Sequence, residues 1–167
     1  ALEGVVERSG TRAAVQADGI DERVGVEFWK TFISRMRASW GIEVALVPTF
    51  VNYGANVAAF EPISYMLSSF GARNPQANRN VKTQGADAHA RGKPWMQPVS
   101  LQDNRPKSGA FDEAHNSETL RTTWQAAIDL DAQWVQLVTW NDYGEGTMIE
   151  PTREFGYQFL EIVQDAR

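Results

Sequence analysis

The chain has 167 residues, of which 43% are hydrophobic and 22% are charged, a composition typical of a single globular domain and unlike that of disordered or fibrous chains. Sixteen Lys and Arg against 21 Asp and Glu give a net charge of −5, which argues against nucleic acid as a partner. No run of residues approaches the roughly 20 apolar residues that a membrane-spanning helix needs, so we expect no membrane partner.

The chain begins with a strand and a helix. Residues 11–17 predict a weak strand, and residues 24–40 predict an amphipathic helix. Gly41 follows this helix as a stop signal. The apolar residues that recur with helical spacing are Phe28, Trp29, Phe32, Ile33, Met36 and Trp40.

Two further strands are predicted before the middle of the chain. Residues 43–50 are mostly apolar, as expected for a strand that other structure covers on both faces. Residues 60–67 fit either a short strand or a helical turn, because Pro62 argues against a long central strand. We interpret residues 60–67 as a strand.

The second half of the chain continues the alternation. The predicted elements are a helix over residues 78–91, a strand over 93–100, a loop over 101–116, a helix with Ser117 as its N-cap, a strand over 134–140 and a closing helix that includes residues 155–163. Alternating strands and helices predict an α/β fold in which helices connect the strands of a parallel sheet. We expect residues 1–167 to form one domain.

Functional residues of parallel sheets gather at the carboxyl ends of the strands and in the loops that follow. Four segments rich in polar and aromatic residues occupy such positions: Asn52, Tyr53 and Asn56; Ser64 and Tyr65; residues 97–105; and residues 141–150. We therefore expect Tyr53, Gln97, Asp142 and Glu145 to converge on one concave face.

Residues 140–152 hold the densest chemistry in the chain. The polar and aromatic members of this segment are Trp140, Asn141, Asp142, Tyr143, Glu145 and Glu150. Carboxylates accept hydrogen bonds from sugar hydroxyls, and an aromatic ring offers a face on which a sugar can stack. Gly144 and Gly146 permit backbone conformations that are strained in other residues. A structural role is the alternative, in which Asp142 and Glu150 cap this loop and the following helix.

The sequence VTWNDYGEGTMIEPT…FGYQFLE, residues 138–161, resembles the C-terminal signature of the glycoside hydrolase family 71 and family 99 superfamily. That superfamily includes α-1,3-glucanases and endo-α-mannosidases, and residues 44–50 and 92–100 resemble two of its strands in order and spacing. The resemblance implies a (β/α)8 barrel. Because such a barrel takes about 250 residues, we interpret the chain as four or five βα units from its C-terminal part, with the missing half supplied by the parent chain or another copy.

The resemblance implies hydrolysis of an α-linked glucan or mannan by carboxyl groups, with Glu61, Asp142 and Glu145 as the catalytic candidates. The candidates for binding the oligo- or polysaccharide are Asn52, Tyr53, Tyr65, Gln97, Trp140, Asn141, Tyr143 and Glu150. Without the remaining strands, the isolated chain should bind glycan weakly and hydrolyse little of it.

No metal and no cofactor is expected, because the chain has no cysteine and only His89 and His115 as histidines. Two other functions stay open: a carbohydrate-binding protein without hydrolytic activity, and a flavodoxin-like module for another small molecule. The latter fits the chain length but lacks a phosphate-binding loop motif. The absence of cysteine leaves the compartment open, and a polysaccharide substrate favours an extracellular or periplasmic location.

Overall fold

The computed structural model describes residues 8–9, 12–18, 25–105, 109–112 and 117–165. These residues form two compact units. One unit contains the described residues of Ala1–Phe70 and Asp87–Met96, and the other contains those of Gly71–Ala86 and Gln97–Arg167.

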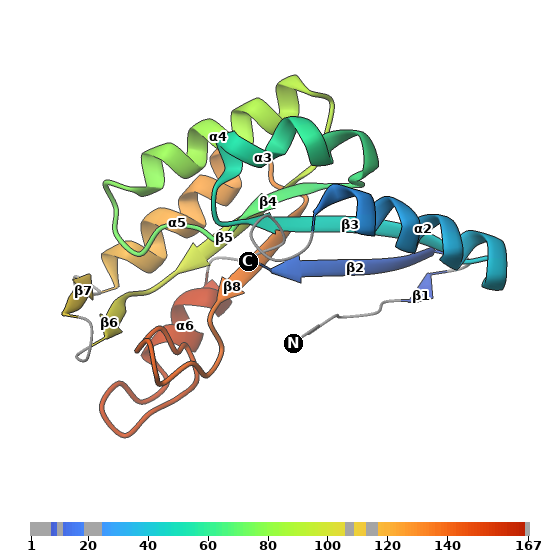
Figure 1. Ribbon diagram of the computed structural model, residues 1–167. Helices are drawn as coiled ribbons and strands as arrows, with labels where there is room; N and C mark the ends of the chain where they lie inside the picture. The colour runs from blue at the N-terminus through green and yellow to red at the C-terminus, as the bar shows by residue number, and fades with distance from the viewer. Residues whose placement is uncertain (1–7, 10–11, 19–24, 106–108, 113–116, 166–167) are drawn as a thin grey trace. The chain divides into compact units, whose positions relative to one another are not determined.

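The strands of the first unit are mainly parallel (Figure 1). They are β1 (Arg8–Ser9), β2 (Arg12–Asp18), β3 (Glu43–Phe50), β4 (Leu67–Ser69) and the first residues of β5 (Trp95–Ser100). β1 is antiparallel to β2, whereas β2 runs parallel to β3 over seven residues. β4 is short and pairs in parallel with β3 on one side and β5 on the other. The predicted strand over residues 43–50 is confirmed, and the predicted strand over residues 11–17 is confirmed from residue 12 onward, since residue 11 lies outside the described residues.

Two α-helices and one 3-10 turn belong to the same unit: α2 (Val26–Trp40), α3 (Tyr53–Phe60) and η1 (Glu61–Ile63). α2 ends where Gly41 adopts a left-handed conformation with φ of 63°, as the stop signal predicts. Asn52 caps α3 by accepting a hydrogen bond from the backbone N–H of Ala55. The predicted strand over residues 60–67 is wrong, since α3 continues into η1 and only Leu67 of that range lies in a strand.

The core of this unit forms where β3 meets its neighbours. Val47, Met66 and Met96 pack together in one buried cluster. Phe50 at the end of β3 makes edge-to-face contacts with Tyr53 and with Phe60 on α3. Burial of these large side chains fixes α3 on β3.

The second unit contains most of α4 (Asn78–Ala90), the rest of β5, and a hairpin of β6 (Asp103–Arg105) and β7 (Ala110–Asp112). It ends with α5 (Glu118–Asp129), β8 (Trp134–Val138) and α6 (Gln158–Asp165). The sheet order is β1-β2-β3-β4-β5-β8, so the three predicted strands now numbered β3, β5 and β8 are neighbours or near neighbours. The expected loop over residues 101–116 is in part a hairpin, and the closing helix starts three residues later than residue 155.

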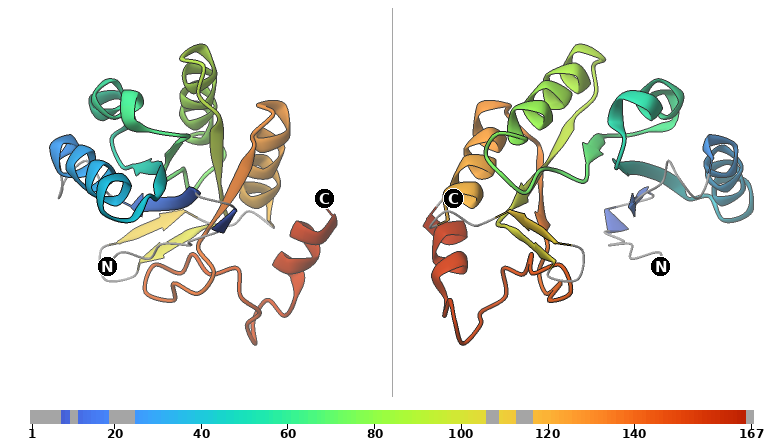
Figure 2. Two further views of the ribbon diagram at one scale, coloured as in Figure 1. Left: turned by 90° about the vertical axis from the view of Figure 1, so that its right-hand side faces the viewer. Right: turned by 60° about the vertical axis from the view of Figure 1, so that its left-hand side comes forward.

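The core of this unit joins β5, α5 and α6. Val99, Leu101, Leu120, Ile149, Phe159 and Ile162 form its buried cluster. Figure 2 shows α5 and α6 on the same side of β8 in both views. Ser117 precedes α5 but makes no side-chain capping bond to it; its Oγ instead accepts a hydrogen bond from Gln158 of α6. The predicted α/β class with a parallel sheet is therefore confirmed.

Candidate functional site

The segment after β8 folds into a turn that Asp142 organises. Asp142 Oδ1 accepts a hydrogen bond of 2.9 Å from the backbone N–H of Glu145, and its own N–H donates to Thr139 Oγ1 at 3.1 Å. The carbonyl of Asp142 accepts from the N–H of Thr147 at 3.1 Å. Asp142 thus caps the turn, and this turn sets the backbone direction of Glu145.

Hydrogen bonds from β6 and from the residue before it also hold the turn in place. The N–H of Asn104 donates to the carbonyl of Glu145 at 2.7 Å, and Gln102 Nε2 donates to the carbonyl of Gly146 at 2.7 Å. Gly146 has φ of 64° and lies so close to Asn104 that a Cβ would be 2.9 Å from its carbonyl oxygen. A glycine is therefore required at position 146.

Two guanidinium groups face the carboxylate of Glu145. Arg105 Nη1 lies 3.5 Å from Glu145 Oε1, and Arg73 Nη2 lies 3.9 Å from Glu145 Oε2. Arg105 also forms a two-pronged ion pair with Asp103, whose side chain is 5% exposed. Arg73 donates to Ser100 Oγ at 3.3 Å, so β5 helps to position it. Glu145 is 34% exposed and Arg105 is 42% exposed, so solvent or a ligand can reach both, whereas Arg73 is only 10% exposed.

The charges of this cluster influence one another. Burial lowers the pKa of Arg73, and the nearby carboxylates of Glu145 and Asp103 oppose that change. Hydrogen bonding to Asp103 raises the pKa of Arg105. Both arginines remain charged, because the ordinary pKa of a guanidinium is far above neutral pH. The cluster can therefore hold a carboxylate in a fixed orientation beside a ligand.

Two exposed aromatic side chains flank the carboxylates. Trp140 is 47% exposed and Tyr143 is 58% exposed. The hydroxyl of Tyr143 donates to Glu150 Oε2 at 2.7 Å, and this hydrogen bond raises the pKa of Tyr143. Asn141 is exposed beside them, and its carbonyl accepts from the N–H of Tyr143. The segment thus presents ring faces and acid groups on the same turn.

The first unit contains the remaining predicted residues. Tyr53 is buried at 5% exposure and stands edge-to-face against Phe50 and Trp95. Its hydroxyl donates to Asp87 at 2.9 Å, and burial together with Asp87 raises the pKa of Tyr53. Asn52 is exposed and caps α3. These contacts give Tyr53 a packing role within its unit.

Glu61 does not lie at the carboxyl end of a strand. It belongs to η1, which precedes β4, and it forms an ion pair of 3.6 Å with Lys93, which precedes β5. Tyr65 also precedes β4 and is 46% exposed. Both residues are on the amino side of their strand, whereas barrel enzymes place catalytic groups at the carboxyl side. This position gives no support to a catalytic role for Glu61.

The structure brings Asp142 and Glu145 together within the second unit, to which the fully buried Gln97 also belongs. Tyr53 belongs to the first unit, so the predicted convergence of all four residues stays a prediction. The sequence reasoning missed Arg73, because only the fold brings it from the end of β4 to Glu145. Its one sequence signal is its position shortly after a strand and a glycine.

The described residues contain no group of three or more His, Cys, Asp or Glu side chains placed to hold a metal ion. Among the described helices, none combines the length and apolar character that crossing a membrane requires.

Comparison with known proteins gives one family and one fold. The model of glycosyl hydrolase family 71 matches residues 23–165. A search of curated proteins finds no match. The GH99 endo-α-mannosidase from Bacteroides thetaiotaomicron is similar in structure, with a TM-score of 0.71 at 16% identity over 96% of this chain and 56% of that chain. A second structure of that enzyme, in complex with bis-tris-propane, gives a TM-score of 0.61 at 13% identity over 91% of this chain and 69% of that chain.

The two structural likenesses show the fold, which is that of a partial (β/α)8 barrel. The chain spans only 56% of the length of the first of these structures. The family match extends over most of the chain, from the helix α2 to the helix α6. The chain belongs to glycosyl hydrolase family 71.

Proposed function

We propose that this chain carries the catalytic carboxyl groups of a glycoside hydrolase that acts on an α-linked glucan or mannan. The single observation that carries the proposal is the turn after β8, where Asp142 holds the backbone of Glu145 and two arginines face the Glu145 carboxylate. Family membership and the structural likeness to an endo-α-mannosidase support the same reaction class.

Glycoside hydrolysis takes two carboxyl groups, one to protonate the leaving oxygen and one to act as base or nucleophile. Asp142 and Glu145 are the pair that the geometry favours. Their side chains project from the same turn, and the negative charge of each carboxylate favours the charged form of Arg73 by raising its pKa. Arg73 and Arg105 orient Glu145 and offset its charge. Glu61 is left out, because it precedes β4 and pairs with Lys93.

The exposed rings of Trp140 and Tyr143 supply faces for stacking against the sugar. Glu150 holds the hydroxyl of Tyr143 and thereby limits the rotation of its ring. Asn141 is exposed next to Trp140 and offers an amide for hydrogen bonds to sugar hydroxyls. Sugar binding and acid chemistry therefore share one short segment of the chain.

The test compares amide variants in the polypeptide as its gene encodes it. Asp142→Asn keeps an Oδ1 acceptor for the N–H of Glu145, so the turn persists and only the charge is removed. Each of Asp142→Asn and Glu145→Gln should lower the release of reducing ends from α-1,3-glucan or α-mannan by about 10²–10⁴-fold. Asp131→Asn is the matched control, because Asp131 is exposed and its φ of 48° suits asparagine.

The choice of substrate distinguishes which of the two carboxyl groups is the proton donor and which is the base or nucleophile. An aryl glycoside with a good leaving group restores the rate of a variant that lacks the proton donor, whereas it does not restore a variant that lacks the base or nucleophile. Calorimetric titration with the same oligosaccharides distinguishes a carbohydrate-binding protein, for which binding occurs without new reducing ends. Full activity of both amide variants would overturn the proposed pair.

A further inference from the structure

One aromatic side chain of the second unit lies outside its core. Phe111 belongs to β7 and is 63% exposed, whereas Phe159 of the same unit is 3% exposed and packs against Phe155. Burial is what lets an aromatic ring stabilise a fold, so an open ring on a strand of three residues contributes little to stability. What Phe111 can do therefore depends on what lies beside it.

The topology of the chain places Phe111 next to the turn after β8. The hairpin of β6 and β7 follows β5, the turn with Asp142 and Glu145 follows β8, and β5 and β8 are neighbours in the sheet. Both segments start at the carboxyl ends of adjacent strands, where barrel enzymes build their sites. Figure 2 shows the hairpin beside this turn in both views.

The residue opposite Phe111 contacts that turn. Asn104 of β6 pairs with Phe111 of β7 in antiparallel register, so their side chains project from one face of the hairpin, with Cβ atoms about 4.5–5.5 Å apart. A Cβ added to Gly146 would lie 2.9 Å from Asn104 Cβ, and the Asn104 N–H donates to the carbonyl of Glu145 at 2.7 Å. The face that carries Phe111 therefore adjoins the backbone of the catalytic candidate Glu145.

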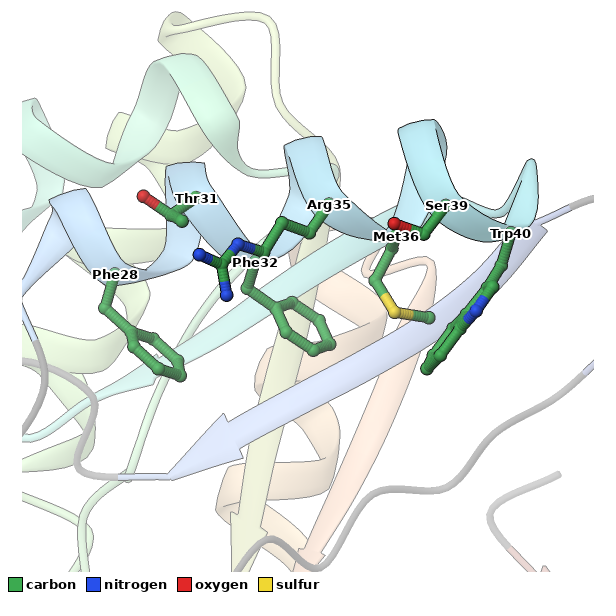
Figure 3. Close-up of a pocket in the computed structure, with 7 residues that line it drawn as sticks. All are labelled: Phe28, Thr31, Phe32, Arg35, Met36, Ser39 and Trp40. Carbon is green, nitrogen blue, oxygen red and sulfur yellow. The ribbon is translucent and has the colours of Figure 1, made fainter.

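Exposure of aromatic residues does not by itself identify a ligand site, and α2 provides the contrast. Four apolar side chains project from α2 toward the sheet and line a hollow there (Figure 3): Phe28, Phe32, Met36 and Trp40. A helix packs on its sheet with such an apolar row, so this row serves the fold of the first unit. Phe111 differs, because its neighbours are the polar Asn104 and the acidic turn.

A sugar ring is bound by an aromatic face on which it stacks and by polar groups that hydrogen-bond its hydroxyls. Phe111 and the exposed Asn104 present a ring and an amide on one face of the hairpin. We infer that the β6–β7 hairpin forms a further glycan subsite, in which one sugar unit stacks on Phe111 and hydrogen-bonds the side chain of Asn104. This inference rests on the proposed function, and it extends the bound glycan beyond the units at Trp140 and Tyr143.

The test measures oligosaccharide affinity in the polypeptide as its gene encodes it, with Glu145→Gln present throughout to prevent turnover. Calorimetry gives the dissociation constants of α-1,3-linked gluco-oligosaccharides and of α-linked manno-oligosaccharides, from the disaccharide upward. Phe111→Ala removes the ring, Phe111→Tyr keeps it, and Asn104→Ala removes the amide. Ile128→Ala is the matched control, because Ile128 is 58% exposed but lies at the end of α5 that leads into the start of β8.

Phe111→Ala should weaken the binding of longer oligosaccharides by about tenfold, with a smaller change for the disaccharide. Asn104→Ala should weaken it by roughly threefold. Phe111→Tyr and Ile128→Ala should bind within about twofold of the Glu145→Gln protein. The midpoint of urea unfolding, measured for each variant, should stay unchanged.

Unchanged affinity of Phe111→Ala at every length would overturn the inference and leave the proposed function standing. A lowered midpoint of urea unfolding with unchanged affinity would also overturn it, because Phe111 would then be a packing residue. New reducing ends produced by the Glu145→Gln protein would instead contradict the proposed carboxyl pair. If the Glu145→Gln protein bound neither series of oligosaccharides, both the subsite and the proposed function would be wrong.

Discussion

Replacement of Gly146 by alanine tests the packing of the turn that carries Glu145. Gly146 has φ of 64°, a conformation that an L-residue adopts only with strain. An added Cβ would lie 2.9 Å from Asn104 Cβ and 2.9 Å from the Asn104 carbonyl oxygen. The backbone cannot rotate away as a flexible side chain would, so the two segments must separate.

The magnitude follows from two contributions. The left-handed conformation disfavours alanine by about 1–2 kcal/mol, and overpacking against backbone adds about 1–3 kcal/mol. We therefore expect Gly146→Ala to lower the free energy of unfolding by about 2–5 kcal/mol. Separation would also weaken the hydrogen bond from Asn104 N–H to the carbonyl of Glu145.

Urea unfolding, followed by circular dichroism, measures this change. Gly156→Ala is the matched control, because Gly156 also has a positive φ of 55° but no atom within 4 Å of the added Cβ. It should lose only the conformational part, about 1–2 kcal/mol. Equal losses in the two variants would refute the argument that close contact with Asn104 requires glycine at position 146.

Two other substitutions probe the units that support the site. Thr123→Val removes a fully buried hydroxyl that accepts a hydrogen bond from the N–H of Ser100, so we expect a loss of about 1–3 kcal/mol in urea unfolding. Thr122→Val is the control and should leave the free energy of unfolding almost unchanged. Equal losses in the two variants would contradict a stabilising role for the buried Thr123 hydroxyl. The hydrogen bond from Arg91 holds the pKa of Asp87 below its ordinary value of 3.8. The stabilisation from this ion pair is fully present above the ordinary pKa of 3.8 and is lost as the pH falls through the lower pKa of the folded state. The Asp87→Asn variant lacks this ion pair. When the pH is lowered from about 5 to about 2, its free energy of unfolding should therefore fall less than that of the unaltered protein. Parallel acid curves for the two proteins would exclude the ion pair as a cause.

Hydrophobic spacing was sufficient to predict the long elements. The row of aromatic residues in α2 and the apolar run of β3 each predict their element within about two residues, because local pattern and burial agree. β4 differs, since its three residues form a strand only through pairing with β3 and β5. The residues before Glu61 form α3, and the chain continues directly into the 3-10 turn η1. The residues around Pro62 therefore carry no local pattern that predicts where β4 begins.

The candidate site was predictable only where it is contiguous. Asp142, Glu145 and the aromatic residues around them lie in one segment, and the rule that functional groups follow strands identified it. Arg73 lies 72 residues earlier and reaches Glu145 only in the folded second unit. The strands of the β6 hairpin have three residues each, and β6, which contacts Gly146, is entirely polar, so this contact has no sequence signal.

The most direct test of the central claim is a crystal structure of the Glu145→Gln variant with a bound α-linked oligosaccharide. The variant keeps the shape of the site and removes the charge, so an uncut ligand should remain bound. We predict that a glycosidic oxygen lies within about 3.5 Å of the side chain of Asp142 or of residue 145, with a sugar ring against Trp140 or Tyr143. A ligand bound at the amino side of the strands, beside Glu61 and Lys93, would contradict this account.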